Sequence, residues 1–163
     1  MVIYAKITIE REDRKIKKDY IALLNSGAGL TIYDPELDFL PILYILVPWG
    51  VAKELEVSKR SMIKRGEKFW VDTASSYTVC LYDPDDNPVK CVRNIILVVE
   101  DGLNEILIPY EFLAVTGIDL RPSKHSWVCE GKEILSIFRA KSIREIDKRL
   151  LKYTRYRRYG VSD

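Results

Sequence analysis

Hydrophobic and polar residues alternate along the first ten positions of the chain. This alternation puts four apolar side chains on one face of residues 2–10 and predicts a strand there. The charged stretch 11–19 predicts a hairpin turn that returns the chain into a second strand at Tyr20. The four apolar residues of the first strand are Ile3, Ala5, Ile7 and Ile9.

Further strands follow in the middle of the chain. Residues 68–82 predict either a pair of strands or one long bent strand, and residues 89–100 predict another. The acidic, proline-containing run 83–88 between them is typical of a turn. Residues 105–108 predict a short buried strand.

Helical signals are weaker. Residues 109–116 predict one or two helical turns that end at Gly117, because glycine adopts the left-handed conformation of a helix C-cap. The segment 39–64 is ambiguous, since the helical spacing of its leucines is interrupted at residues 48–50, Pro-Trp-Gly. Asp34 to Asp38 is expected to be a loop.

Length and composition indicate one globular domain. The chain has 163 residues, of which 47% are hydrophobic and 31% charged. The longest apolar run, 39–49, is too short for a membrane span and contains two prolines. The first residues lack the basic start of a signal peptide, so we expect a cytoplasmic protein. Glutamine is absent while Ile, Tyr, Lys, Arg and Glu are frequent, which indicates a thermophile.

The three cysteines and the lone His125 match no metal-ligand spacing, so we expect no metal and no other cofactor. Cys80 and Cys91 flank the predicted turn and could form a disulfide. In an ordinary cytosol they would instead be reduced thiols, as would Cys129.

One polar loop stands out from this pattern. An apolar strand, 21–24, runs directly into Asn25-Ser26-Gly27, and Ala28-Gly29 then leads into a second apolar strand. Small and polar residues held closely between strands are typical of a functional loop on a rigid scaffold.

This passage resembles the active-site loop of the retropepsin-like aspartic peptidases, of an archaeal type. The family signature has apolar residues, then Asp-Thr/Ser-Gly-Ala, then another apolar strand. Leu24, Ser26, Gly27 and Ala28 fit that signature, as do Leu23, Leu30 and Ile32. Asn25 stands where the family has its catalytic aspartate.

Two later segments extend the resemblance over residues 1–128. Residues 106–113 and Gly117-Ile118 are similar to the family's closing motif, with Pro109 in place of a glycine and Glu111 in place of an aspartate. The flap hairpin that covers the substrate cleft in the family falls at Asp72, Thr73, Ala74 and Ser75. Asp72-Thr73-Ala74 also leaves open a second Asp-Thr-Gly-like loop, or simply an aspartate between strand and turn.

The resemblance implies a mainly β protein with a closed retropepsin-like barrel and a short helix near 110–116. It implies a homodimeric endopeptidase acting on polypeptides, because one chain supplies only one catalytic loop. In the family two carboxylates share a proton and activate water, and the hydroxyl at the position of Ser26 bonds across the two-fold axis. The neutral amide of Asn25 cannot accept that proton, so the sequence as written implies little or no hydrolysis.

Asn25 has several explanations that the sequence leaves open. The first explanation is an engineered substitution that traps an inactive enzyme. The second is a natural change that marks a non-catalytic dimeric module binding peptide or nucleic acid. Spontaneous deamidation of Asn25-Ser26 to aspartate, or a different active pair, are the remaining explanations.

The chain changes character near its end. We divide it into a β domain, 1–138, and a basic helix and tail, 139–163, because Ser142 and Glu145 form a capping box at the start of an apolar stripe. This helix is a candidate for weak nucleic-acid binding, and the alternative is that it packs on the body or across a dimer. The candidate contacts are Lys148, Arg149, Lys152, Arg155, Arg157 and Arg158.

Overall fold

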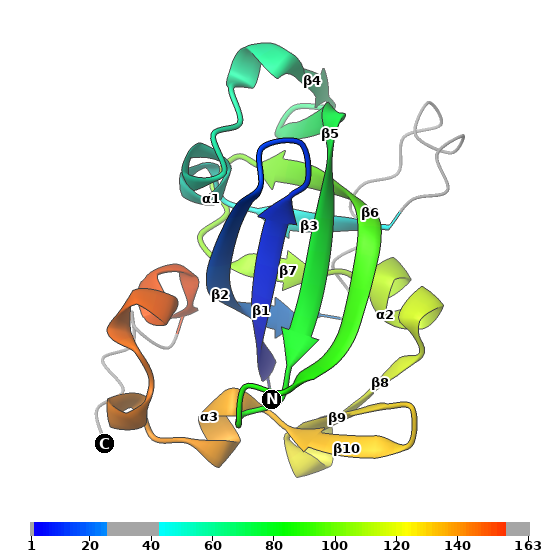
Figure 1. Cartoon of the computed structure of the whole chain (residues 1–163), viewed down its shortest axis with the longest axis vertical. Helices are drawn as coiled ribbons and strands as arrows, with labels where there is room; N and C mark the ends of the chain where they lie inside the picture. Colours follow the sequence, from blue (N-terminus) through cyan, green and yellow to red (C-terminus); the bar gives the residue numbers. More distant parts are fainter. Residues whose placement is uncertain (1, 26–42, 156–163) are drawn as a thin grey trace.

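The computed structural model describes residues 2–25 and 43–155, and these form a mainly β protein (Figure 1). A seven-stranded sheet closes on itself, and a separate three-stranded sheet lies at one end of it. The strands of the large sheet are β1 (Ile3–Arg11), β2 (Ile16–Leu24), β3 (Tyr44–Val47), β4 (Met62–Arg65), β5 (Phe69–Tyr82), β6 (Pro88–Glu100) and β7 (Ile106–Ile108); those of the small sheet are β8 (Ile118–Arg121), β9 (Ser126–Cys129) and β10 (Lys132–Leu135).

The large sheet forms a barrel of six strands in the order β1-β2-β7-β3-β6-β5. It closes because β5 pairs with β1 as well as with β6, from Lys6 opposite Tyr82 to Arg11 opposite Tyr77. The pairs β2–β7 and β3–β6 are parallel, and β4 continues the sheet beyond β5. The predicted fold class, mainly β with a closed barrel, is confirmed.

The alternation in the first strand fills the barrel as predicted. Ile3, Ala5, Ile7 and Ile9 are all buried in the main core. The predicted hairpin turn at 11–19 is too long, because β2 already begins at Ile16 and its charged residues 17–19 lie exposed on the strand. Charged side chains are compatible with a strand whose outer end faces water.

Residues 69–82 form one long strand rather than two. Its pairing with β6 shifts register between Asp72 and Tyr77, which is the bend that the sequence allowed. The turn predicted at 83–88 is present, and the carboxylate of Asp83 accepts hydrogen bonds from the backbone N–H groups of Asp85 and Asn87. Cys80 lies opposite Cys91 and is joined to it by a disulfide.

The ambiguous segment after residue 42 divides into short elements. A strand, β3, is followed by helix α1 (Trp49–Glu54), a 3-10 turn (Lys59–Ser61) and β4. Helix α2 (Tyr110–Thr116) lies where it was predicted, and Gly117, with φ 72°, is its left-handed C-cap. The loop expected at Asp34–Asp38 lies outside the described residues.

The C-terminal segment is helical, but it is not the one continuous basic helix that the capping box predicted. It consists of helix α3 (Ile137–Ala140) and two 3-10 segments, Ile143–Glu145 and Lys148–Tyr153. The capping box itself is present. The second hydrophobic cluster packs these turns on the barrel, because it joins Tyr4, Ile21 and Leu23 of the barrel to Ile137, Ile146 and Leu151.

A carboxylate fastens the end of this segment to the body. Glu54 of α1 accepts hydrogen bonds from the hydroxyls of Tyr20 (2.9 Å) and Tyr153 (2.8 Å), and from the amine of Lys152 (3.0 Å). Burial alone would raise the pKa of Glu54, but the hydrogen bonds from Tyr153, Lys152 and Tyr20 lower it below its ordinary value. The last described turn therefore docks on β2 and α1; the proposed division at residue 138 stays a prediction.

Among the described residues, no helix is both long and apolar enough to cross a membrane.

Gly50 offers a test of this docking, because a Cβ atom there would overlap the ring and hydroxyl of Tyr153. We expect Gly50→Ala to reduce the free energy of unfolding by about 2 kcal/mol and to expose the C-terminal segment to limited proteolysis. In a Tyr153→Ala background the same change should cost almost nothing, since alanine favours the helix. An equal cost in both backgrounds would contradict the contact.

The disulfide gives a second test. Its two cysteines are 11 residues apart in sequence, and a cross-link closing a loop of this size stabilises a fold by about 3 kcal/mol. We expect the double variant Cys80→Ser/Cys91→Ser to lose that amount in denaturant unfolding. Thiol titration of the unfolded, unreduced protein should find Cys129 alone; three reactive thiols would refute the pairing.

Candidate functional site

The predicted catalytic position lies at the end of a barrel strand. Asn25 directly follows β2, and its backbone N–H donates a hydrogen bond to the carbonyl oxygen of Ile108, the last residue of β7, at 3.1 Å. The side chain of Asn25 is half-buried. Ser26, Gly27 and Ala28, the other predicted residues of this loop, lie outside the described residues.

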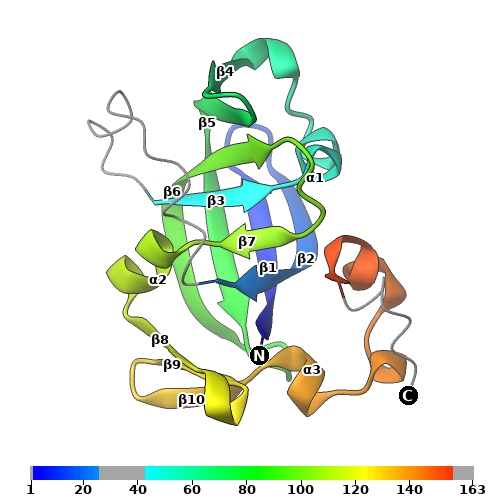
Figure 2. The ribbon, with the colours of Figure 1, turned by 180° about the vertical axis from the view of Figure 1, so that it is seen from behind.

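The surrounding topology gathers three segments at one end of β7. Strand β7 lies between β2 and β3, which Figure 2 shows from behind. It runs parallel to β2, with Leu24 opposite Ile108, and antiparallel to β3, with Leu107 opposite Leu46. Consequently the end of β2 and the start of β3 lie at the same end of β7, where α2 begins.

A hydrogen bond at this end joins two segments that are distant in sequence. The hydroxyl of Tyr44, at the start of β3, donates to Oε2 of Glu111 in the first turn of α2 at 3.4 Å. Burial and then the charge of Glu111 raise the pKa of Tyr44 above its ordinary value, so the hydroxyl remains a donor. Glu111 therefore ties α2 to β3.

Sequence reasoning missed Tyr44 at this site. It begins a continuous apolar run, Tyr44–Val47, whose residues are all buried. A tyrosine in such a run gives no sign that its hydroxyl has a distant partner, so no sequence signal identified it.

Asp72 occupies a structural position. It is buried, its Oδ1 accepts the N–H of Ala74 at 3.0 Å, and its Oδ2 accepts the hydroxyl of Tyr77. These bonds hold the irregular part of β5, where Asp72 lies opposite Met62 of β4 and Leu97 of β6. Asp72 and Asn25 thus lie in different parts of the barrel, which favours the strand-to-turn interpretation of Asp72 over a second catalytic loop.

The predicted flap residues Asp72, Thr73, Ala74 and Ser75 lie within β5, before its pairing with β1 begins. The turn that connects β4 to β5 is further toward the N-terminus, at Gly66, and this hairpin extends beyond the barrel at the top of Figure 1. A flap role for residues 72–75 stays a prediction.

The basic C-terminal candidates are partly engaged within the chain. Arg149 pairs with Asp147 at 2.7 Å, and Lys152 pairs with Glu54 at 3.0 Å. Lys148 and Arg155 are exposed, whereas Arg157 and Arg158 lie outside the described residues. Tyr153 packs edge-to-face on Tyr20, with ring centroids 5.9 Å apart. Nucleic-acid binding by this segment stays a prediction, and the packed part of it favours the structural alternative.

Comparison with known proteins yields a likeness in fold. No family model matches the chain, and no curated protein matches it. Among solved structures, the chain is similar to the retroviral protease-like domain of Ddi1 from Leishmania major, with a TM-score of 0.47 and 9% sequence identity. The match covers 83% of this chain and 93% of that one. At this identity the likeness says nothing about chemistry.

The structural role of Asp72 can be tested by stability. Asp72→Ala leaves the buried hydroxyl of Tyr77 without its acceptor, so we expect the free energy of unfolding to fall by about 2 kcal/mol. Glu67→Ala, at an exposed acidic position near the turn of the same hairpin, is the matched control and should change it by less than about 0.5 kcal/mol. Denaturant unfolding measures the change for each variant, and equal losses in the two variants would contradict a structural role of Asp72.

Proposed function

We propose that the chain is a retropepsin-like domain that assembles as a homodimer, binds polypeptide, and in the form of this sequence does not hydrolyse it. The observation that carries the proposal is the placement of Asn25. It follows β2, is held by its backbone to Ile108, and lies beside the start of α2. This is where the resemblance puts the catalytic aspartate.

The chemistry of the side chain decides against turnover. An aspartic peptidase needs a carboxylate that takes a proton from the attacking water. The carboxamide of asparagine is neutral at physiological pH and has no basic site for that proton. It keeps a donor and an acceptor, which are the groups that recognise a peptide backbone. The site is therefore suited to binding rather than to general base catalysis.

Assembly into a dimer is supported by two exposed apolar side chains of α2. Tyr110 and Val115 are 50% and 70% exposed, although both are large and apolar. Helix α2 begins directly after Ile108 and Pro109, so these side chains lie on the element next to Asn25. Exposed apolar residues near an incomplete site favour a second copy of the chain as the partner that covers them.

The test is restoration of the carboxylate. Asn25→Asp should produce cleavage of an unfolded protein substrate at acidic pH, inhibited by pepstatin-like peptide mimics, while the unmodified chain should show none. Asn94→Asp makes the same charge change at an exposed position in β6 and should stay inactive.

Two accompanying measurements make the result decisive. Intact-mass spectrometry of the unmodified chain excludes prior deamidation, which would add about 1 Da at an asparagine. Sedimentation analysis of both forms should give a dimer, which Tyr110→Lys should weaken. Equal peptidase activity of the unmodified chain and the Asn25→Asp variant would refute the proposal, as would a monomer that binds peptide normally.

A further inference from the structure

Two tryptophans form a joint surface away from the candidate active site. Trp49 begins α1 and Trp70 lies in β5, and their rings meet edge-to-face with centroids 5.8 Å apart. Both indole N–H groups donate to the carboxylate of Asp101, at 2.7 Å and 3.4 Å. Each tryptophan is only half-buried. One exposed carboxylate thus holds two aromatic rings in a fixed orientation at the surface.

Lysine side chains cover these rings. The amine of Lys59 lies 4.3 Å from the centre of the Trp70 ring and 5.3 Å from that of Trp49, and the amine of Lys64 lies 5.5 Å from Trp70. Both lysines are exposed, so these cation–π contacts are weak and the side chains are able to move.

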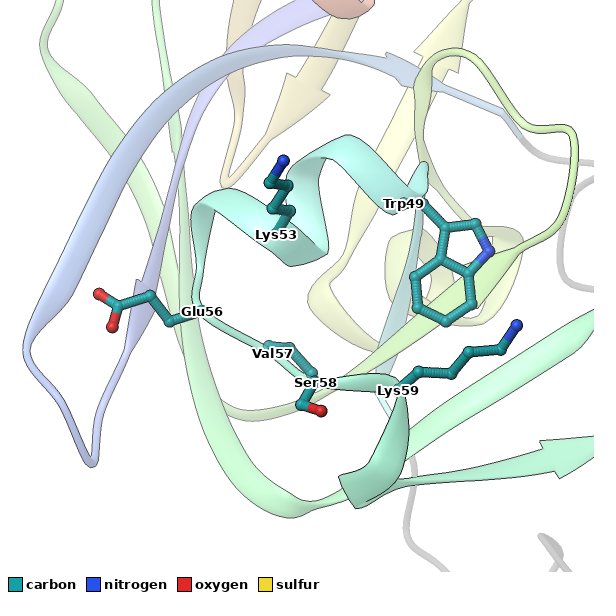
Figure 3. A pocket seen from close by; sticks show the side chains of 6 residues that line it. All are labelled: Trp49, Lys53, Glu56, Val57, Ser58 and Lys59. Atoms are coloured by element: carbon teal, nitrogen blue, oxygen red, sulfur yellow. The ribbon is translucent and has the colours of Figure 1, made fainter.

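A hollow of about 480 Å³ adjoins the tryptophan pair (Figure 3). At one side of the hollow the side chain of Lys59 runs alongside the Trp49 ring, and Ser58 lies near the middle of the hollow. Glu56 points away on the far side and pairs with Arg14 at 3.6 Å. The part of the hollow next to the indole ring therefore combines an aromatic wall with a cation.

The segment that carries Lys59, Lys64 and Trp70 is strongly positive. Residues 59–70, which form the 3-10 turn and the β4–β5 hairpin, contain five cations and one acid. The nearby acid Asp101 is engaged by both indoles, and these hydrogen bonds lower its pKa below the ordinary value. The cations are Lys59, Arg60, Lys64, Arg65 and Lys68, and the acid is Glu67.

We propose that this surface, formed by Trp49, Trp70, Lys59 and Lys64, binds single-stranded nucleic acid. Bases stack on the indole rings, and the two lysines move from the ring faces to the phosphates. Stacking on aromatic side chains combined with neutralisation of phosphates by lysine is the general basis of single-strand binding. The bases of a duplex are already stacked on one another and do not reach the rings.

The observations favour this ligand over two others. A cationic ligand would suit the rings and Asp101, but the amines of Lys59 and Lys64, which already lie over the rings, repel it. An acidic peptide would pair with the lysines, but it would leave the two indole faces without a partner. The surface also differs from the C-terminal segment, where Arg149 and Lys152 are already paired within the chain.

The test measures binding of the full chain to a fluorescein-labelled single-stranded oligothymidylate by fluorescence anisotropy. Lys59→Gln/Lys64→Gln should weaken binding about tenfold or more, and should flatten the dependence of log K on log salt by about 0.7 for each lost phosphate contact. Lys17→Gln/Lys18→Gln removes the same charge from exposed positions of β2 and should change binding less than about twofold.

A tryptophan variant separates stacking from charge. Trp49→Leu should weaken binding about fivefold or more at high salt, and circular dichroism should show an unchanged fold. The proposal is overturned if the unmodified chain does not bind, if Lys17→Gln/Lys18→Gln loses as much affinity as Lys59→Gln/Lys64→Gln, or if Trp49→Leu binds normally. It is equally overturned if a duplex of the same length, or oligoglutamate, competes as well as the single strand.

Discussion

The pairing of β7 on both of its edges is the constraint on which the candidate site depends. This strand has only three residues, yet it is parallel to β2 on one side and antiparallel to β3 on the other. The pairing brings Asn25, the start of β3 and the start of α2 to one place. The hydrogen bond from Asn25 to Ile108 and the one from Tyr44 to Glu111 both form there. A short strand suffices because Ile106 and Ile108 are fully buried and fix its position.

Those parts of the fold that have a clear period could be predicted from the sequence. The alternation of β1 and the capped helix before Gly117 are local patterns, and each is present as expected. Strand β3 could not be predicted, because it is buried on both faces: Ile45 and Val47 belong to the main core, while Tyr44 and Leu46 belong to a second cluster. A strand buried on both faces has no alternation, and its apolar run cannot be distinguished from a helix.

The C-terminal segment and the candidate sites could be predicted only in part, because they depend on contacts between residues that are distant in sequence. An apolar stripe with a capping box predicts a helix. Which apolar residues of this segment are buried depends, however, on the barrel surface, and the residues of that surface are distant in sequence. Asn25 could be proposed as a candidate because its neighbours in sequence resemble the family's motif. The pair Tyr44–Glu111 and the cluster of Trp49, Trp70 and Asp101 could not, since their partners come from separate elements.

Residue 25 is held in place by its backbone, so its position does not depend on whether its side chain is an amide or a carboxylate. The bond to Ile108 uses the peptide N–H, which asparagine and aspartate share. We therefore expect exchange of the side chain to leave this backbone bond at the end of β2 in place. In an aspartic peptidase two adjacent carboxylates must share a proton, because like charges at close range repel each other. Two facing amides have no such requirement and can form hydrogen bonds at any pH in the physiological range. In the proposed dimer, asparagine at position 25 removes general base catalysis and also the electrostatic obstacle to pairing two loops, and this agrees with the proposal of a domain kept for assembly and binding.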